Sequence, residues 1–187
     1  IFISSSLALC DFASIATEEY HLSPKTIYGA GKAAAERFVI SHALPSYAIV
    51  RLAAVYGFGD LNGRATTIFM EKSFAGEPFS VNTNSVSDFI YVKDAVSGIR
   101  KVAEWDKNGI MNISSGVTHP LTHFAEEIST VIGIPLQYDL YETNDRPVRA
   151  ALANAKARSH LSWEPQYCLQ QGIKEIVGYY HETGIYR

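Results

Sequence analysis

The N-terminal third of the chain alternates between short, wholly apolar runs and one segment of helical period. The run 1–3 (Ile-Phe-Ile) is closed by three serines, and the run 47–52 is closed by the glycines of 57–59. Continuous apolar runs of this length are typical of strands that are buried on both faces of a parallel sheet. Between them, side chains recur on one face of an expected helix that ends at about Ser41: Tyr28, Lys32, Ala35 and Val39. The order strand, helix, strand predicts a βαβ unit and an α/β fold.

The rest of the chain continues this alternation with shorter elements. We expect helices over 66–75, from Asp94 past Val102, over 121–131 and over 173–180, and short strands at 79–81, 89–92 and 110–113. Asp94 is expected to cap its helix, and three glycines are expected to end helices: Gly76, Gly133 and Gly184. The sequence has no repeat and no long linker, so a second lobe would be interleaved with the first.

Composition excludes several classes of function. The 187 residues include 16 Lys+Arg and 19 Asp+Glu, and the basic residues are scattered, so the chain lacks a patch for nucleic acid or an anionic membrane. The longest apolar stretch, 38–50, is interrupted by His42 and Pro45 and falls short of the ~20 residues of a membrane-spanning helix. Cys10 and Cys168 lie far apart, without partners at metal-ligand spacing. We therefore expect a globular, cytoplasmic protein without a metal site.

Tyr28 and Lys32 place a phenol and an ammonium group four residues apart, on one face of the expected helix. A neighbouring ammonium group favours the phenolate, which adapts a tyrosine to general acid–base chemistry. This spacing is also common by chance, and the alternative is a solvated helix face with a packed tyrosine. However, a serine cluster ending at Ser6 closes the first strand, and open α/β sheets bind ligands at the carboxyl ends of their strands. This combination favours a catalytic site.

Together these motifs resemble the C-terminal portion of the NAD-dependent epimerase/dehydratase family, which are extended short-chain dehydrogenases/reductases. The run 1–6 resembles the family's strand that ends in a catalytic Ser or Thr, and Tyr28 and Lys32 resemble its Tyr-x-x-x-Lys pair. Glu18 and Pro24 stand where the family has Glu and Pro before that tyrosine. Further segments that resemble the family are 51–57, 87–94, 112–116 and 161–165.

The resemblance implies an incomplete Rossmann-like parallel sheet with helices, plus a small α/β substrate-binding lobe. It assigns 1–59 and 93–113 to the remnant of the dinucleotide-binding domain, and 60–92 and 114–187 to the substrate-binding lobe. The family's N-terminal strand and glycine-rich turn, which bind the pyrophosphate of the cofactor, have no counterpart in this sequence. We therefore expect a fragment that begins inside a strand and lacks the pyrophosphate-binding half.

A different glycine pattern, Gly29-Ala30-Gly31, loosely imitates a dinucleotide-binding turn. It follows no predicted strand, and no acidic residue lies about 20 positions further on in the right context. We interpret these glycines as part of the expected helix.

The resemblance also implies a catalytic set. Ser6 would hydrogen-bond the reacting oxygen, Tyr28 would transfer its proton, and Lys32 would hold the nicotinamide ribose and support the phenolate. Tyr28 and Lys32 would therefore also contact the cofactor, NAD or NADP. The chemistry would be the alcohol–ketone oxidoreduction of a sugar epimerase or reductase. Dehydration is disfavoured, because Leu7 and Ala8 follow Ser6 where sugar dehydratases have an acidic pair.

The implied substrate is a sugar derivative, and in this family usually a nucleotide sugar. Ala54 and Ser87 stand where many members have an Asn and an Arg that contact the diphosphate, so two anion contacts are absent. Three arginines remain as candidate anion ligands: Arg64, Arg146 and Arg149. The expected substrate-binding set is therefore Ser6, Ala54, Ser87, Arg64, Arg146 and Arg149.

Two functions stay open at this point. The first is an NAD(P)-dependent sugar epimerase or reductase, expected as a homodimer built on helices like 28–41, where Ala33-Ala34-Ala35 permits close approach. The second is a non-catalytic remnant or interaction module that has lost its cofactor site. A glycine-rich strand–turn–helix encoded upstream in the same reading frame would favour the enzyme.

Overall fold

The centre of the molecule is a three-stranded parallel sheet. The computed structural model describes residues 1–9, 15–42, 46–60, 63–135, 137–143 and 151–183. The sheet has the order β1-β2-β6, formed by β1 (Phe2–Ser5), β2 (Ala48–Leu52) and β6 (Gly109–Ile113). Its register places Ser4 opposite Arg51, and Arg51 opposite Asn112. The predicted strand–helix–strand unit is confirmed, because α1 (Ile27–His42) connects β1 and β2.

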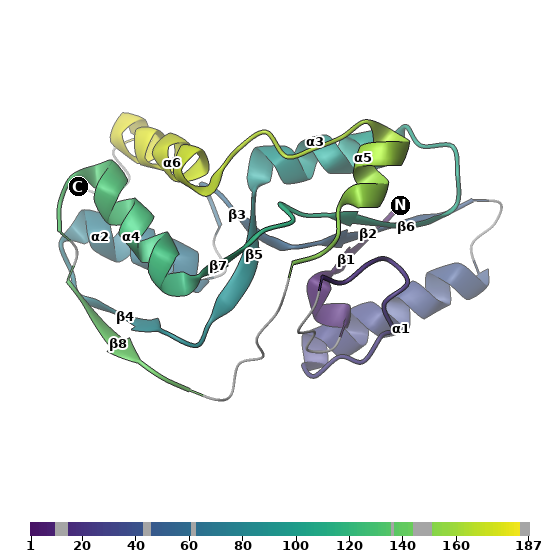
Figure 1. Cartoon of the computed structure of the whole chain (residues 1–187), viewed down its shortest axis with the longest axis horizontal. Helices are drawn as coiled ribbons and strands as arrows, with labels where there is room; N and C mark the ends of the chain where they lie inside the picture. The colour runs from purple at the N-terminus through teal and green to yellow at the C-terminus, as the bar shows by residue number, and fades with distance from the viewer. Residues whose placement is uncertain (10–14, 43–45, 61–62, 136, 144–150, 184–187) are drawn as a thin grey trace.

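Helices lie on both sides of this sheet. Figure 1 shows α1 on one side and α3 (Val92–Ala103) on the other, with the short helix α5 (Ala155–Leu161) beside β6. The apolar core between the sheet and α3 is formed by Val50, Ala95, Val102, Met111, Ile113, Leu161 and Trp163, among others. The face of α1 that is turned inward consists of Gly29, Ala33 and Glu36. Each of these residues follows by one position a residue of the face that the sequence pattern predicted, which was Tyr28, Lys32, Ala35 and Val39.

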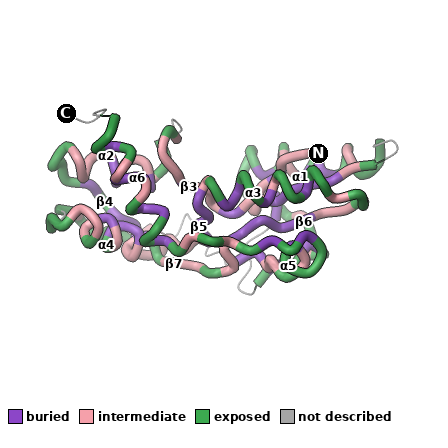
Figure 2. Tube along the Cα trace, turned by 90° about the horizontal axis from the view of Figure 1, so that it is seen from above, coloured by how far each residue is buried: buried purple, intermediate pink, exposed green. Residues whose placement is uncertain are grey.

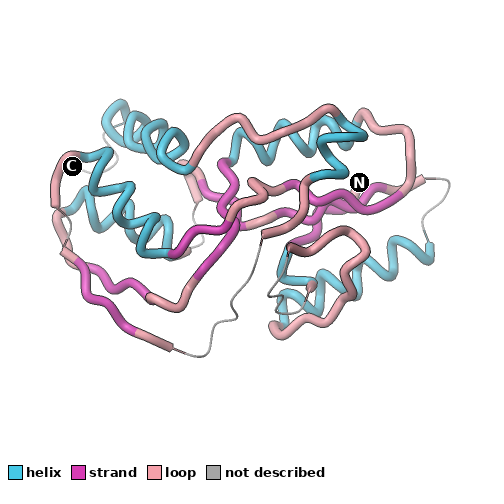
Figure 3. Tube along the Cα trace, in the orientation of Figure 1, coloured by secondary structure: helices cyan, strands magenta, loops and turns pink. Residues whose placement is uncertain are grey.

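A second group of elements forms the other end of the molecule (Figure 3). Strands β3 (Ala54–Tyr56), β5 (Val86–Tyr91) and β7 (Thr118–Pro120) form one sheet, and β4 (Phe79–Asn82) pairs with β8 (Tyr138–Tyr141). Helices α2 (Ala65–Ala75), α4 (Leu121–Ile132) and α6 (Leu169–Thr183) pack around them. Figure 2 shows buried stretches of chain in this group as well as in the central sheet. The buried core of the group is rich in aromatic rings, including Tyr56, Phe69, Phe79, Phe89, Phe124 and Tyr180. The α/β class with parallel pairing is thus confirmed.

Helix ends agree with the sequence pattern at two positions and differ at a third. Gly76 and Gly133 follow α2 and α4 with φ of 67° and 76°, the left-handed conformation expected of a helix stop. Gly184 lies outside the described residues. The expectation that Asp94 caps α3 is wrong, since α3 begins at Val92 after Tyr91. The buried Asp94 carboxylate instead accepts the backbone N–H groups of Gln166 and Tyr167, both at 3.0 Å, and so anchors an incoming loop.

In the part of the chain that the structure describes, no helix is long and apolar enough to cross a membrane.

Candidate active site

A cleft of about 620 Å³ opens where the central sheet meets the second group of elements. Its walls come from the ends of β1 and β2, the first turns of α1 and α2, and one face of β5. Open α/β sheets place ligands at the carboxyl ends of their strands, and the cleft has this position. The cleft lies between the core of the central sheet and the aromatic core of the second group, so residues that are far apart in the sequence line it together.

The three serines that end β1 have different environments. The buried Ser4 hydroxyl donates to Glu36 Oε1, and Ser5 Oγ accepts the backbone N–H of Leu7 at 3.2 Å. This second bond caps the short 3-10 helix η1 (Ser6–Ala8). Ser6 begins η1 and lines the cleft. Ser4 and Ser5 thus have bonds within the protein, and Ser6 remains the candidate serine for a ligand.

The first turn of α1 lies directly against η1. A Cβ atom on Gly29 would lie 2.0 Å from the carbonyl oxygen of Leu7, so this approach requires a glycine. Tyr28, which is 56% exposed, therefore lines the same cleft as Ser6. Gly29 and Gly31 both lie inside α1, as the interpretation of the glycine pattern expected.

Gly29→Ala is therefore expected to destabilise the chain by about 1–3 kcal/mol, because the new methyl group must displace the Leu7 backbone. Gly31→Ala is the matched control: it lies in the same helix, and its Cβ would meet nothing within 4 Å. That change should stabilise the chain by up to about 1 kcal/mol through helix propensity. Urea unfolding followed by circular dichroism measures both. Equal effects would show that η1 and α1 are not in close contact.

Lys32 follows Tyr28 by one helical turn and reaches β1. Its Nζ donates to the carbonyl oxygen of Ile3 at 2.8 Å and lies 5.6 Å from the centroid of the Tyr28 ring. An ammonium group has three donors, so the bond to Ile3 leaves capacity for the hydroxyls of a ligand. The phenol and the ammonium are thus side by side, as the four-residue spacing predicted.

Three of the predicted substrate contacts also meet in the cleft. Ala54, Arg64 and Ser87 all line it. The Arg64 guanidinium donates to the carbonyl oxygen of Val55 at 3.0 Å, and its Nε lies 3.5 Å from Asp60 Oδ2. Its position at the start of α2 is therefore fixed from two sides. The other predicted ligands, Arg146 and Arg149, lie outside the described residues.

The sequence reasoning missed several cleft residues. The hydroxyl groups of Thr66 and Ser85 line the cleft together with the apolar side chains of Phe89 and Leu121. Ser85, Ser87 and Phe89 alternate along one face of β5 and its lead-in, and this period of two was the available signal. Among the described lining residues Arg64 is the one charged side chain. Seven lining residues carry hydroxyl groups, and two of these, on Ser4 and Ser5, are already bonded within the protein. Such a surface suits a polyhydroxylated ligand.

Asp88 supports the cleft wall from behind. Its carboxylate accepts the backbone N–H groups of Ser115, Gly116 and Leu152 and the hydroxyl of Ser115, at 2.6–3.3 Å. Burial raises the pKa of Asp88 to about 6. These bonds tie β5 to the turn after β6, so the strand that carries Ser87 is held rigidly.

A second hollow of about 490 Å³ adjoins the cleft. It lies between α2, β4 and β8, and Gly63 and Ala65 line both hollows. Its walls include three aromatic side chains and two charged ones: Phe69, Phe79, Tyr141, Lys72 and Asp139. A ligand that extends from the cleft past Arg64 would enter this second hollow.

Comparison with known proteins identifies the family. Residues 1–114 match the NAD dependent epimerase/dehydratase family. The chain belongs to this family. The matched range contains Ser6, Tyr28, Lys32 and the cleft residues Ala54, Arg64 and Ser87. The resemblance on which the sequence reasoning relied is thereby confirmed.

Curated members of the epimerase/dehydratase family match most of this chain. UDP-glucuronic acid decarboxylase 1 of Xenopus tropicalis is 25% identical over 169 residues, which are 86% of this chain and 40% of that protein. The putative UDP-glucose 4-epimerase of Methanocaldococcus jannaschii is 27% identical over 170 residues, 87% of this chain and 55% of that protein. The chain therefore spans about half the length of these relatives or less.

Solved structures of this type share the fold. UDP-glucuronic acid 4-epimerase from Bacillus cereus, solved with UDP-glucuronic acid and NAD, superposes with a TM-score of 0.88 at 18% identity. The match covers 97% of this chain and 60% of that one. The agreement extends beyond residue 114, so the second group of elements also belongs to the shared fold.

Proposed function

We propose that this chain is the catalytic and substrate-binding portion of an NAD(P)-dependent enzyme that epimerises or reduces a nucleotide sugar. The observation that carries the proposal is the meeting of Ser6 and Tyr28 in one hydroxyl-rich cleft, with Lys32 one turn further along α1. Family membership and relatives that act on UDP-sugars support the same reading.

The proton chemistry follows from these side chains. When bound, NAD(P) would supply the acceptor for the hydride that leaves a sugar carbon. The Ser6 hydroxyl hydrogen-bonds the oxygen on that carbon, and Tyr28 takes the proton from the same oxygen as the ketone forms. In the reverse direction Tyr28 returns the proton. Lys32, fixed by its bond to Ile3, has N–H donors left for the nicotinamide ribose and fits that part of the cofactor.

The two adjoining hollows suggest how a nucleotide sugar would lie. The hydroxyl-lined cleft would hold the sugar, and the aromatic hollow beyond Gly63 and Ala65 would hold the nucleoside. Arg64 lies in the sequence between Gly63 and Ala65, the two residues that line both hollows, and would bind the diphosphate. Ala54 and Ser87 offer no charge, so we propose that Arg64, together with Arg146 and Arg149, supplies the anion contacts.

We propose the same division of the chain into two domains that the family resemblance implied. Residues 1–59 and 93–113 would form the cofactor-side domain, and residues 60–92 and 114–187 the substrate lobe. Four residues of the second range, Leu152, Ala157, Leu161 and Trp163, pack in the core of the central sheet, so this part of the lobe would also support the cofactor-side domain. We also propose a cytoplasmic location, because Cys10 and Cys168 lie far apart in the sequence and give no disulfide framework of the kind found in secreted proteins.

The test is turnover by a protein that joins this chain to a glycine-rich cofactor-binding half. UDP-sugars and UDP-ketosugars are incubated with the oxidised or the reduced form of NAD or NADP, and products are identified by NMR. We expect a stereoisomer or a reduced sugar. Release of carbon dioxide from UDP-glucuronic acid would replace the proposed reaction by a decarboxylation. Absence of turnover in a protein that binds the cofactor would favour the alternative, a non-catalytic interaction module.

The 187-residue chain alone is expected to bind NAD and NADP only weakly, with a Kd above about 1 mM. It offers Lys32 to the ribose, but we expect it to lack the backbone amides that hold the pyrophosphate at a helix N-terminus. Calorimetric titration measures this directly. A micromolar Kd would show that the chain holds a complete cofactor site of its own.

We also expect the chain to form a homodimer or a larger assembly. The outer face of α1 carries Ile27, which is 94% exposed, and Phe38, which is 64% exposed, with Gly31 and Ala34 between them. Apolar residues flanking small ones permit another helix to approach closely. Light scattering after gel filtration should show the dimer, and Phe38→Glu should shift it toward monomer. A monodisperse wild-type monomer at every concentration would contradict the expectation.

A further inference from the structure

A row of three buried polar side chains crosses the central sheet. Ser4, Arg51 and Asn112 are register neighbours on β1, β2 and β6, and they are 2%, 2% and 0% exposed. Register neighbours in a sheet project to the same face, so the row forms one polar strip inside an apolar sheet. Polar groups buried this deeply need bonded partners.

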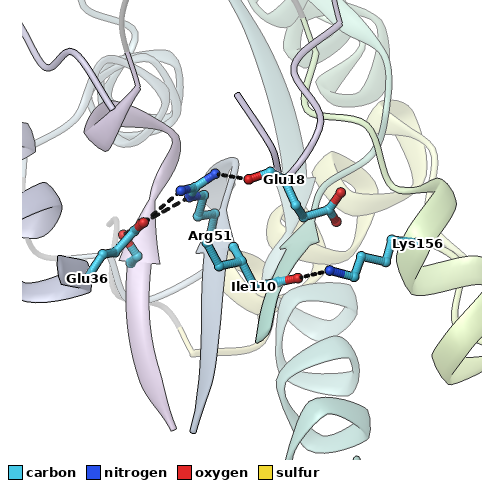
Figure 4. Close-up of polar contacts among 6 residues, drawn as sticks. Glu18, Glu36, Arg51, Ile110 and Lys156 are labelled. Atoms are coloured by element: carbon cyan, nitrogen blue, oxygen red, sulfur yellow. Dashed lines mark hydrogen bonds and ion pairs between the residues drawn. The ribbon is translucent and has the colours of Figure 1, made fainter. Parts of the chain in front are cut away.

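The partner on α1 is Glu36, which is fully buried. Arg51 donates to its two carboxylate oxygens through Nε at 3.0 and 3.2 Å and through Nη2 at 2.7 Å (Figure 4). The Ser4 hydroxyl donates to the same carboxylate. Arg51 Nη1 donates to the carbonyl oxygen of Glu18 at 2.9 Å. The strip thus holds both α1 and the segment that leads to it.

The apolar contacts of α1 fix its position along β1 only at the first turn, where Gly29 approaches the Leu7 backbone. Ala33, the other buried residue besides Glu36, is too small to interlock with a neighbour. A slip by one residue would move the helix by about 1.5 Å and turn it by roughly 100°. Two polar bonds oppose that slip: Glu36 bonds Ser4, and Lys32, one turn earlier, bonds the preceding strand residue, Ile3.

We propose that Glu36 is a positioning residue that sets the register of α1 on β1 and thereby holds Tyr28 and Lys32 against Ser6. A buried ion pair is weak evidence for stability, because desolvation offsets much of the attraction, whereas fixing a register is a well-attested role of buried polar groups. The inference rests on the proposed function only in calling Tyr28 and Lys32 catalytic. The register itself is measurable without cofactor, substrate or turnover.

The decisive variant replaces both charges by apolar side chains, Glu36→Leu with Arg51→Met, in the 187-residue chain. Because no charge is left unpaired, we expect its Tm to equal or exceed the wild-type value. The position of α1 should nevertheless be lost. In NMR spectra, the contacts between the Gly29 α-protons and the Leu7 backbone should weaken at least twofold. The ring signals of Tyr28, assigned with Tyr28→Phe, should broaden or split.

Two controls separate positioning from general effects. Glu164→Leu with Arg158→Met removes an exposed ion pair that is also 2.7 Å long and should leave the Gly29 and Tyr28 signals unchanged. Ile128→Val lowers stability through the other core and should also leave them unchanged. A double variant at 36 and 51 that keeps sharp wild-type signals and contacts would overturn the proposal.

Ser4→Ala keeps the test decisive if the double variant does not fold. It removes one bond to Glu36 and leaves the Arg51 pair in place. We expect partial weakening of the same Gly29–Leu7 contacts. Unchanged contacts in that variant would equally overturn the proposal. Failure of the enzyme assay alone would bear on the proposed function and leave the register result intact.

Discussion

Tyr28→Phe is expected to lower kcat about 10²–10⁴-fold in an enzyme that contains this chain. The substitution removes the one hydroxyl that we assign to proton transfer and keeps the ring. Because Tyr28 is 56% exposed at the edge of the cleft, the fold should remain intact. The measurement is kcat at saturating cofactor and sugar, with Tm recorded on the same samples.

Tyr179→Phe provides the matched control. Tyr179 is a partly exposed tyrosine on α6, outside the cleft lining, so its loss of a hydroxyl should leave kcat near the wild-type value. A Tyr28→Phe enzyme with wild-type kcat would remove Tyr28 from the mechanism. An equal loss in both variants would show that the effect is not specific to the cleft.

Arg51→Met alone is expected to destabilise the chain by about 3–5 kcal/mol. It leaves the Glu36 carboxylate buried without a cation, and it also removes the bond to the carbonyl oxygen of Glu18. Adding Glu36→Leu should recover the whole loss or more, since no unpaired charge then remains. The free energy of unfolding in urea, extrapolated to water, is measured for both variants and for the wild type.

The exposed pair Arg158–Glu164 gives the reference for this prediction. Both of its side chains are more than half exposed, so Arg158→Met should cost less than about 1 kcal/mol. If Arg51→Met costs no more than that, the Glu36 carboxylate is solvated in solution. The structure would then be wrong about the buried strip beneath α1.

The elements that the sequence predicted are those marked by a continuous apolar run or by a helical period. Two continuous apolar runs around a helical period predicted β1, α1 and β2 correctly. The strands β3 and β7 have three residues each, β8 has four, and α5 has seven. At these lengths neither a period of two nor one of 3.6 can be recognised. Pairing with distant strands decides such elements, and a single sequence does not reveal it.

The candidate site was predictable in its motif residues and not in its supports. Ser6, Tyr28 and Lys32 follow from spacing and family resemblance. Glu36 looks like an ordinary solvated side chain of a helix, and the structure buries it completely. The available signal was Arg51, a charged residue inside an apolar strand, which requires a buried partner. The sequence does not show which carboxylate that partner is.

Binding of UDP-glucose to the isotopically labelled chain is the sharpest test that the cleft holds a sugar nucleotide, because it requires neither cofactor nor turnover. Amide chemical shifts are followed as the sugar nucleotide is added. The account predicts that the largest changes occur at Ser6, Tyr28, Thr66 and Ser87 in the cleft, and at Phe79 in the adjoining hollow. Changes confined to the groove beside α3, at Val96, Arg100 and Trp163, or no changes at millimolar ligand, would contradict it.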